Sequence, residues 1–175
     1  ACEKYEHFVC ITGITKFSQL SIFSTINNIT NISMLPQYSA ICGITVDEAL
    51  DVFKPDIQEL ANAYSCSYDE MVDKLKAKYD GYNFCGNSED IFNPFCLTMA
   101  IKNRKIDSYW FGSGTPTYLF EQMKRFGTNI LSLEKITASA SDFDVPTENM
   151  HTALPLLYQS GYLTIKGYDM RLDRY

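Results

Sequence analysis

The stretch at residues 45–79, "TVDEALDVFKPDIQELANAYSCSYDEMVDKLKAKY", decides the fold class because signals for helices follow one another through it. Thr45 with Glu48, and Ser67 with Glu70, match the Ser/Thr-x-x-Glu pattern of a capping box, in which each residue satisfies a backbone N–H of the other at a helix start. We therefore predict that one helix starts after Thr45 and another after Ser67.

Proline, asparagine and glycine signals extend the helical part of the chain. Pro55 suits the first turn of a further helix, and Asn93 followed by Pro94 is typical of a helix start. Thr115-Pro116 predicts another start, and Gly127 predicts the end of that helix. The helix after position 67 carries apolar residues at spacings of three and four, which predicts a core-facing stripe: Met71, Val72, Leu75 and Tyr79.

Strand signals are fewer and lie mainly near the two ends of the sequence. Apolar, partly β-branched runs predict short strands at 8–12 and 32–35, and alternation predicts another at 162–166, with a turn at 167–169. The fold class predicted from these patterns is α/β to mainly α. Because the sequence stops where a hairpin partner of the last strand is expected to begin, and does not begin with Met, we interpret it as a fragment of a longer protein.

Composition places the chain among ordinary globular proteins and disfavours several functions. It has 175 residues, 46% hydrophobic and 21% charged, and a net charge of −6, which disfavours nonspecific nucleic-acid binding. The six cysteines include no C-x-x-C pair and only two histidines are present, so no zinc site is predicted. We expect reduced cysteines and a cytoplasmic protein, with no membrane span and no signal peptide.

Motifs for catalysis are missing from the sequence. It contains no G-x-x-x-x-G-K-[ST] phosphate loop, no G-x-G-x-x-G, no H-E-x-x-H and no G-x-S-x-G. The two histidines, His7 and His151, each flank apolar segments and are interpreted as structural. No catalytic residue and no metal ligand is therefore predicted from the residues alone.

Four separated blocks nevertheless resemble, in order, the bacterial AAA-ATPase-like family. They include "FVCITGITKFSQL", "KYDGYNFCGNSEDIFNPF", "YWFGSGTPTYLFEQMK" and "LPLLYQSGYLTIKGYD". That family is a P-loop ATPase, often joined to a C-terminal nuclease-like domain of the PD-(D/E)xK kind. The resemblance covers nearly all of the chain and implies that it corresponds to the middle of such a parent protein.

The resemblance also implies a division of the chain and a position for the missing motifs. Residues 1–44 would hold the last strands of the ATPase core, 45–127 the helical lid, and 128–175 the incomplete start of a winged-helix-like segment. The phosphate loop would lie upstream of this chain and the nuclease-like domain downstream. The parent would use ATP and Mg, whereas this chain alone is expected to need no cofactor and to have no activity.

Two groups of site residues follow from the same resemblance. Thr12, Thr15 and Lys16 match positions that sense the γ-phosphate in related ATPases. The tripeptide Gly114-Thr115-Pro116 resembles a lid Gly-x-Pro that packs beside the nucleotide base. The alternative interpretations are a simple turn at position 12 with a solvated lysine, and ordinary helix capping at positions 115–116.

A different class of function stays open. The helical part and the winged-helix-like end are also compatible with a protein-interaction or DNA-binding module that has no ATPase activity. Residues 151–160, "HTALPLLYQS", carry no Lys or Arg, which disfavours DNA reading by that helix. The partner expected on either interpretation is the rest of the parent chain, with nucleic acid and membrane disfavoured.

Overall fold

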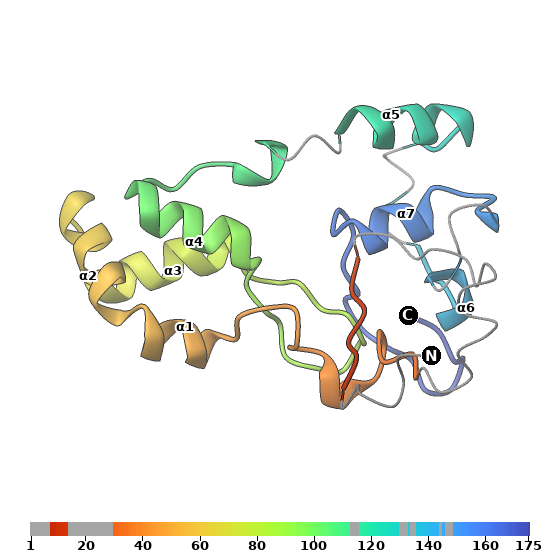
Figure 1. Cartoon of the computed structure of the whole chain (residues 1–175), viewed down its shortest axis with the longest axis horizontal. Coiled ribbons are helices and arrows are strands. Elements are labelled where there is room, and N and C mark those ends of the chain that lie inside the picture. The colour runs from red at the N-terminus through yellow and green to blue at the C-terminus, as the bar shows by residue number, and fades with distance from the viewer. Residues whose placement is uncertain are drawn as a thin grey trace.

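The chain is a two-part helical protein in its described regions. The computed structural model describes residues 8–13, 30–112, 116–129, 133, 136–143, 145 and 149–175. The elements, in order along the chain, are η2 (Pro36–Tyr38), α1 (Val46–Val52), α2 (Lys54–Ala63), α3 (Tyr68–Tyr79), α4 (Pro94–Asn103), η3 (Tyr109–Gly112), α5 (Pro116–Arg125), α6 (Ala140–Phe143) and α7 (Leu154–Gln159). Figure 1 shows α1 to α4 grouped on one side and α5 to α7 on the other.

The two predicted capping boxes are confirmed. At α1 the Thr45 hydroxyl accepts from the Glu48 N–H at 3.2 Å, and the Glu48 carboxylate accepts from the Thr45 N–H at 2.9 Å. Ser67 and Glu70 make the same pair of bonds at α3, at 3.2 and 2.9 Å. These bonds satisfy backbone donors that a helix start otherwise leaves without an intrahelical partner.

The first group of helices packs around a core of its own. α2 and α3 supply Leu60, Met71 and Leu75, and α4 supplies Cys96 and Leu97, all at most 1% exposed. Aromatic residues of η3 pack against the edge of this core. The spacing of these apolar positions on α3 confirms the predicted stripe, and burying each such side chain contributes roughly 1.5–3 kcal/mol.

The second group has two smaller clusters. Leu119 and Met123 of α5 pack against Leu156 and Leu157 of α7 in one of them. Phe143, at the end of α6, belongs to the other cluster, which also includes a tyrosine of α7. α5 thus joins the second group, although it follows directly on from the first group in sequence.

A non-helical arm, residues 80–92, joins the two groups. At its base the Asn93 N–H donates to the Tyr79 carbonyl at 3.0 Å, and the arm folds back on itself through the isolated bridge between Tyr82 and Ile91. At its tip the Tyr158 hydroxyl of α7 donates to the Phe84 carbonyl at 2.8 Å. The arm therefore contacts both groups of helices.

The predicted strands of an ATPase core are not found, and this part of the predicted fold class is wrong. Residues 8–12 are extended but form no strand, and Phe8 is 85% exposed. In the described regions the only β-type pairings are three isolated bridges. An apolar, β-branched run favours a strand only where a neighbouring strand can pair with it, and no described segment pairs with residues 8–12.

The other two predicted strands are wrong for local reasons. At 32–35 the Asn31 side chain accepts from the Ser33 N–H at 3.1 Å, which favours a turn over an extended chain. At 162–166 the Thr164 hydroxyl, not a backbone carbonyl, accepts from the Asn83 N–H at 2.6 Å, so no ladder continues. The turn predicted at 167–169 is found a few residues further along the chain, between Asp169 and Arg174, which form an isolated β-bridge.

The winged-helix-like description of residues 128–175 is corrected together with the strands. The described residues of this region form α6, α7 and turns, with no strand that would serve as a wing. The boundaries predicted at 44 and 127 stay predictions. Within the described parts of the chain, no helix is both long enough and apolar enough to cross a membrane.

Candidate functional site

The residues predicted to sense or contact a nucleotide fall mainly outside the described part of the chain. Thr15, Lys16, Gly114 and Thr115 all lie outside the described residues. Thr12 is exposed to solvent in the extended segment. Of the six predicted site residues, the structure describes Thr12 and Pro116.

The elements on each side of the tripeptide pack in different groups of helices. η3 ends at Gly112 and carries Trp110, which packs on the first core. Pro116 is the first residue of α5, as predicted, and α5 packs on the second group through Leu119 and Met123. In sequence, residues 113–115 thus lie between an element of the first group and the first helix of the second group.

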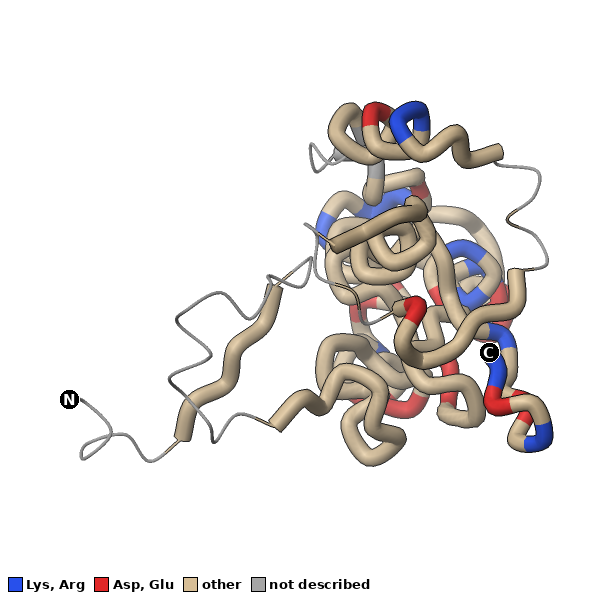
Figure 2. The backbone as a smooth tube through the Cα atoms, turned by 90° about the vertical axis from the view of Figure 1, so that its right-hand side faces the viewer, with Lys and Arg blue, Asp and Glu red and all other residues tan. Residues whose placement is uncertain are grey.

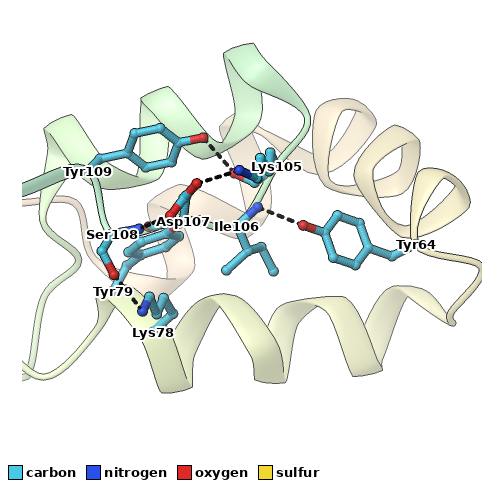
Figure 3. Close-up of polar contacts among 8 residues, drawn as sticks. All are labelled: Tyr64, Lys78, Tyr79, Lys105, Ile106, Asp107, Ser108 and Tyr109. Atoms are coloured by element: carbon cyan, nitrogen blue, oxygen red, sulfur yellow. Dashed lines mark hydrogen bonds and ion pairs between the residues drawn. The ribbon is translucent and has the colours of Figure 1, made fainter.

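A network of polar contacts lies beside this junction, where the segment 105–109 crosses α3 (Figure 3). The Tyr79 hydroxyl accepts from the Asp107 N–H and donates to the Asp107 carbonyl, both at 2.8 Å. Tyr79 is 1% exposed, and burial is the main cause that raises its pKa to about 12. The ring therefore stays neutral and can act as donor and acceptor at once.

Charged groups surround this network. Lys78 donates to the Ser108 hydroxyl at 3.0 Å and lies 5.3 Å from the centre of the Trp110 ring. Lys105 donates to the Asp107 carboxylate at 2.5 Å, and the Ser108 N–H donates to the same carboxylate. Both hydrogen bonds lower the pKa of Asp107, the one from Lys105 more strongly. Each of these contacts fixes the path of the chain between α4 and η3.

A second polar centre is the Asn83 side chain in the arm, which is 5% exposed. Its oxygen accepts from the backbone N–H groups of Cys85 and Gly86 at 3.2 and 2.9 Å. Its nitrogen donates to the Ser88 carbonyl at 2.7 Å. The Asn83 carbonyl accepts in turn from the Ile165 N–H at 3.1 Å, which ties the arm to the second group.

These arrangements position backbone and side chains through ordered polar contacts. Lys78 donates to the Ser108 hydroxyl, so in this contact the ammonium does not act as a base. The described residues also contain no group of three or more side chains that could hold a metal ion. The polar contacts that the structure does describe link α3 with the segment 105–109.

Sequence reasoning missed most of this network. The spacing of apolar residues predicts Tyr79 as part of a core-facing stripe, and the role of the Asn83 side chain in "YDGYNFCGNSED" is not predicted. That run of Gly, Asn, Ser and Asp is typical of a turn held by side-chain bonds, which is a usable signal for Asn83. The contact between Lys78 and Ser108 joins positions far apart in sequence and has no local signal.

Comparison with known proteins gives a relative without a described activity. No model of a known protein family matches the chain, and neither does any solved structure. A curated protein described as "Uncharacterized protein in vnfD 5'region", from Azotobacter chroococcum mcd 1, is 34% identical over 166 residues. The match covers 93% of this chain but 29% of that protein, so the chain spans less than a third of its relative's length.

Proposed function

We propose that this chain is a nucleotide-responsive helical region of a larger P-loop ATPase and has no ATPase activity of its own. The observation that carries the proposal is that η3 packs on the first core whereas α5, the next element in sequence, packs on the second group. The tripeptide that includes Thr115 and Pro116 is the one that resembles a nucleotide-contacting Gly-x-Pro. Ligands commonly bind where separately packed units meet.

The proposed response is a change in how the two groups of helices lie relative to each other. A ligand shifts such an equilibrium only by binding one arrangement more tightly than the other. A nucleotide that contacts residues 114–116 in one arrangement would supply that difference. The arm is a second connection between the two groups of helices, because its Asn83 carbonyl accepts from the Ile165 N–H. This connection would limit the movement.

The phosphate-holding groups are proposed to come from elsewhere in the parent protein. This sequence contains no phosphate loop, so ATP and Mg would be held mainly by residues outside it. Thr12, Thr15 and Lys16 are proposed to approach the γ-phosphate from this chain. The match covers 29% of the Azotobacter protein, which is therefore more than three times as long as this chain. A relative of that length is compatible with such a parent protein.

A DNA-reading role is disfavoured by burial as well as by charge. Leu156, Leu157 and Tyr158 of α7 are buried, and the helix carries no Lys or Arg that could reach a groove. In Figure 2 the basic positions lie in short separate stretches among acidic ones, without one continuous stripe. A sequence-independent DNA contact needs clustered positive charge, and α7 carries no Lys or Arg.

Turnover of ATP by the full-length parent protein tests the proposal. Lys16→Ala should lower kcat by about a hundredfold, as is typical when one group that stabilises transferring phosphate is removed. Lys54→Ala, which removes the same charge from an exposed position at the start of α2, should leave kcat unchanged. Failure of the full-length protein to bind ATP, or equal turnover in both variants, would contradict the proposal.

A further inference from the structure

A shallow recess lies on the first group of helices and shares Lys78 and Ile106 with the polar contacts drawn in Figure 3. It has a volume of about 410 Å³ and is lined by Tyr64, Lys74, Ala77, Lys78 and Ile106. We call this feature the α3 recess, because Lys74, Ala77 and Lys78 all belong to α3. Its volume lies at the lower end of the range of about 300–1,000 Å³ that small-molecule sites occupy, which suits a single ring.

The wall opposite α3 is apolar and is held in place. In Figure 3 the Tyr64 ring and the Ile106 side chain lie on the same side of α3. The Tyr64 hydroxyl accepts from the Ile106 N–H at 2.8 Å, which ties the segment after α4 to the end of α2. The recess therefore has an ordered apolar surface before any ligand is present.

The α3 wall carries positive charge without an acidic lining residue. Lys74 and Lys78 are four residues apart on one helix face, where like charges repel each other. Lys78 donates to Ser108, but an ammonium has three donors, so others stay available. The nearest acid on the facing segment, Asp107, already accepts from Lys105 and from the Ser108 N–H.

We propose that the α3 recess binds a small amphipathic anion: an aromatic ring, or an apolar body of similar size, that carries one phosphate or carboxylate group. The ring would lie against Ile106, Ala77 and the Tyr64 ring, and the anionic group would lie between the two lysines. Such an anion relieves the repulsion between Lys74 and Lys78 and covers apolar surface. The inference does not depend on the proposed nucleotide response.

Titration of the whole chain with defined probes, followed by ¹H–¹⁵N NMR, tests this inference. Phenyl phosphate and benzoate should give saturable shifts of the amide signals of Ala77 and Ile106. Inorganic phosphate and benzyl alcohol, which each lack one half of the proposed ligand, should bind more weakly. The better of the two aromatic anions shows whether phosphate or carboxylate is preferred.

Charge variants separate the site from a general electrostatic effect. Lys74→Ala should weaken phenyl phosphate binding about twofold to fivefold, as expected for one partly solvated charge contact. Lys76→Ala removes the same charge from α3 at a position that does not line the recess, and should leave affinity unchanged. Ser108→Ala keeps the Lys78 charge while removing its hydrogen bond, and should retain binding.

Several results would overturn the inference. One is the absence of saturable shifts at Ala77 and Ile106 with either aromatic anion. Another is equal weakening by Lys74→Ala and Lys76→Ala, which would indicate nonspecific attraction to the helix. Affinity for inorganic phosphate equal to that for phenyl phosphate would show that the apolar wall takes no part.

Discussion

Replacement of Asn83 by alanine should destabilise the protein, because this side chain holds a group of buried hydrogen bonds in the arm. The Asn83 oxygen accepts from the N–H groups of Cys85 and Gly86, and both of these bonds are buried. Its nitrogen donates to the Ser88 carbonyl at 2.7 Å and lies 3.3 Å from an Asp90 carboxylate oxygen. Alanine removes all of these contacts and leaves their partners in place.

The expected magnitude follows from the partners that lose their bonds. A buried donor or acceptor left without a partner costs about 1–3 kcal/mol, and an intact neutral hydrogen bond contributes about 1 kcal/mol. The Cys85 and Gly86 N–H groups are the most buried partners, and water can reach some of the others. We therefore expect Asn83→Ala to lower the free energy of unfolding by about 2–4 kcal/mol.

Urea denaturation monitored by circular dichroism measures this change. Asn62→Ala is the matched control, because Asn62 lies on α2 and its side chain accepts an exposed bond from Gln58 at 3.2 Å. That control should change the free energy of unfolding by no more than about 0.5 kcal/mol. A loss below about 1 kcal/mol in Asn83→Ala would refute the reasoning, because the side-chain bonds would then contribute no more than a single average one.

Hydrogen exchange in the same variant tests the link between the arm and the second group. The backbone bond from the Ile165 N–H to the Asn83 carbonyl is not removed by the substitution. If the Asn83 side chain holds the arm in shape, however, this N–H should exchange faster in Asn83→Ala. Unchanged exchange at Ile165 would mean that the arm keeps its position without the side chain.

Two further changes test other parts of the structure by urea denaturation. Gly43→Ala should destabilise by about 1–3 kcal/mol, because the added methyl group would overlap the buried Ile91 side chain; a neutral effect would show that this approach is not close. Ser67→Ala should cost about 1 kcal/mol at neutral pH through loss of the α3 cap. Bonds from Ser67 lower the pKa of Glu70, so this carboxylate stabilises the fold above its unfolded pKa and less as the pH falls through its folded pKa. The cost of Ser67→Ala should therefore shrink in acid, and a cost independent of pH would contradict the assigned capping box.

The helices could be predicted because their signals are local. Each capping box joins residues three apart, as Thr45 and Glu48 show, and Asn93 caps α4 by accepting from the Cys96 N–H at 3.0 Å. The end of α5 was predicted from Gly127, which has the positive φ of +60° that glycine adopts without strain. In all of these cases the interactions that decide the structure lie within one turn of the residue concerned.

The strands could not be predicted in the same way, because a strand depends on a partner elsewhere. The pattern at residues 8–12 is typical of a strand, yet no described segment pairs with it. At 162–166 a partner is present, but the Thr164 side chain replaces a backbone acceptor beside Asn83. Neither outcome follows from alternation or composition.

The candidate site was predictable only in part. The helix start at Pro116 is confirmed, and it locates one end of the tripeptide that resembles a nucleotide contact. The pairs that build the polar network and the α3 recess, such as Tyr79 with Asp107 and Tyr64 with Ile106, are separated by whole helices. Their meeting depends on the packing of α2, α3 and α4, which no local pattern specifies.

Hydrogen exchange of the full-length parent protein, with and without a nonhydrolysable ATP analogue and Mg, tests the central claim most directly. If residues 113–116 contact the nucleotide, the analogue should slow exchange in the first turn of α5 and change exchange in the arm at residues 80–92. The helices α2 and α3, which pack within the first core, should exchange as before. Identical exchange at α5 and the arm in the presence of bound analogue would contradict the account.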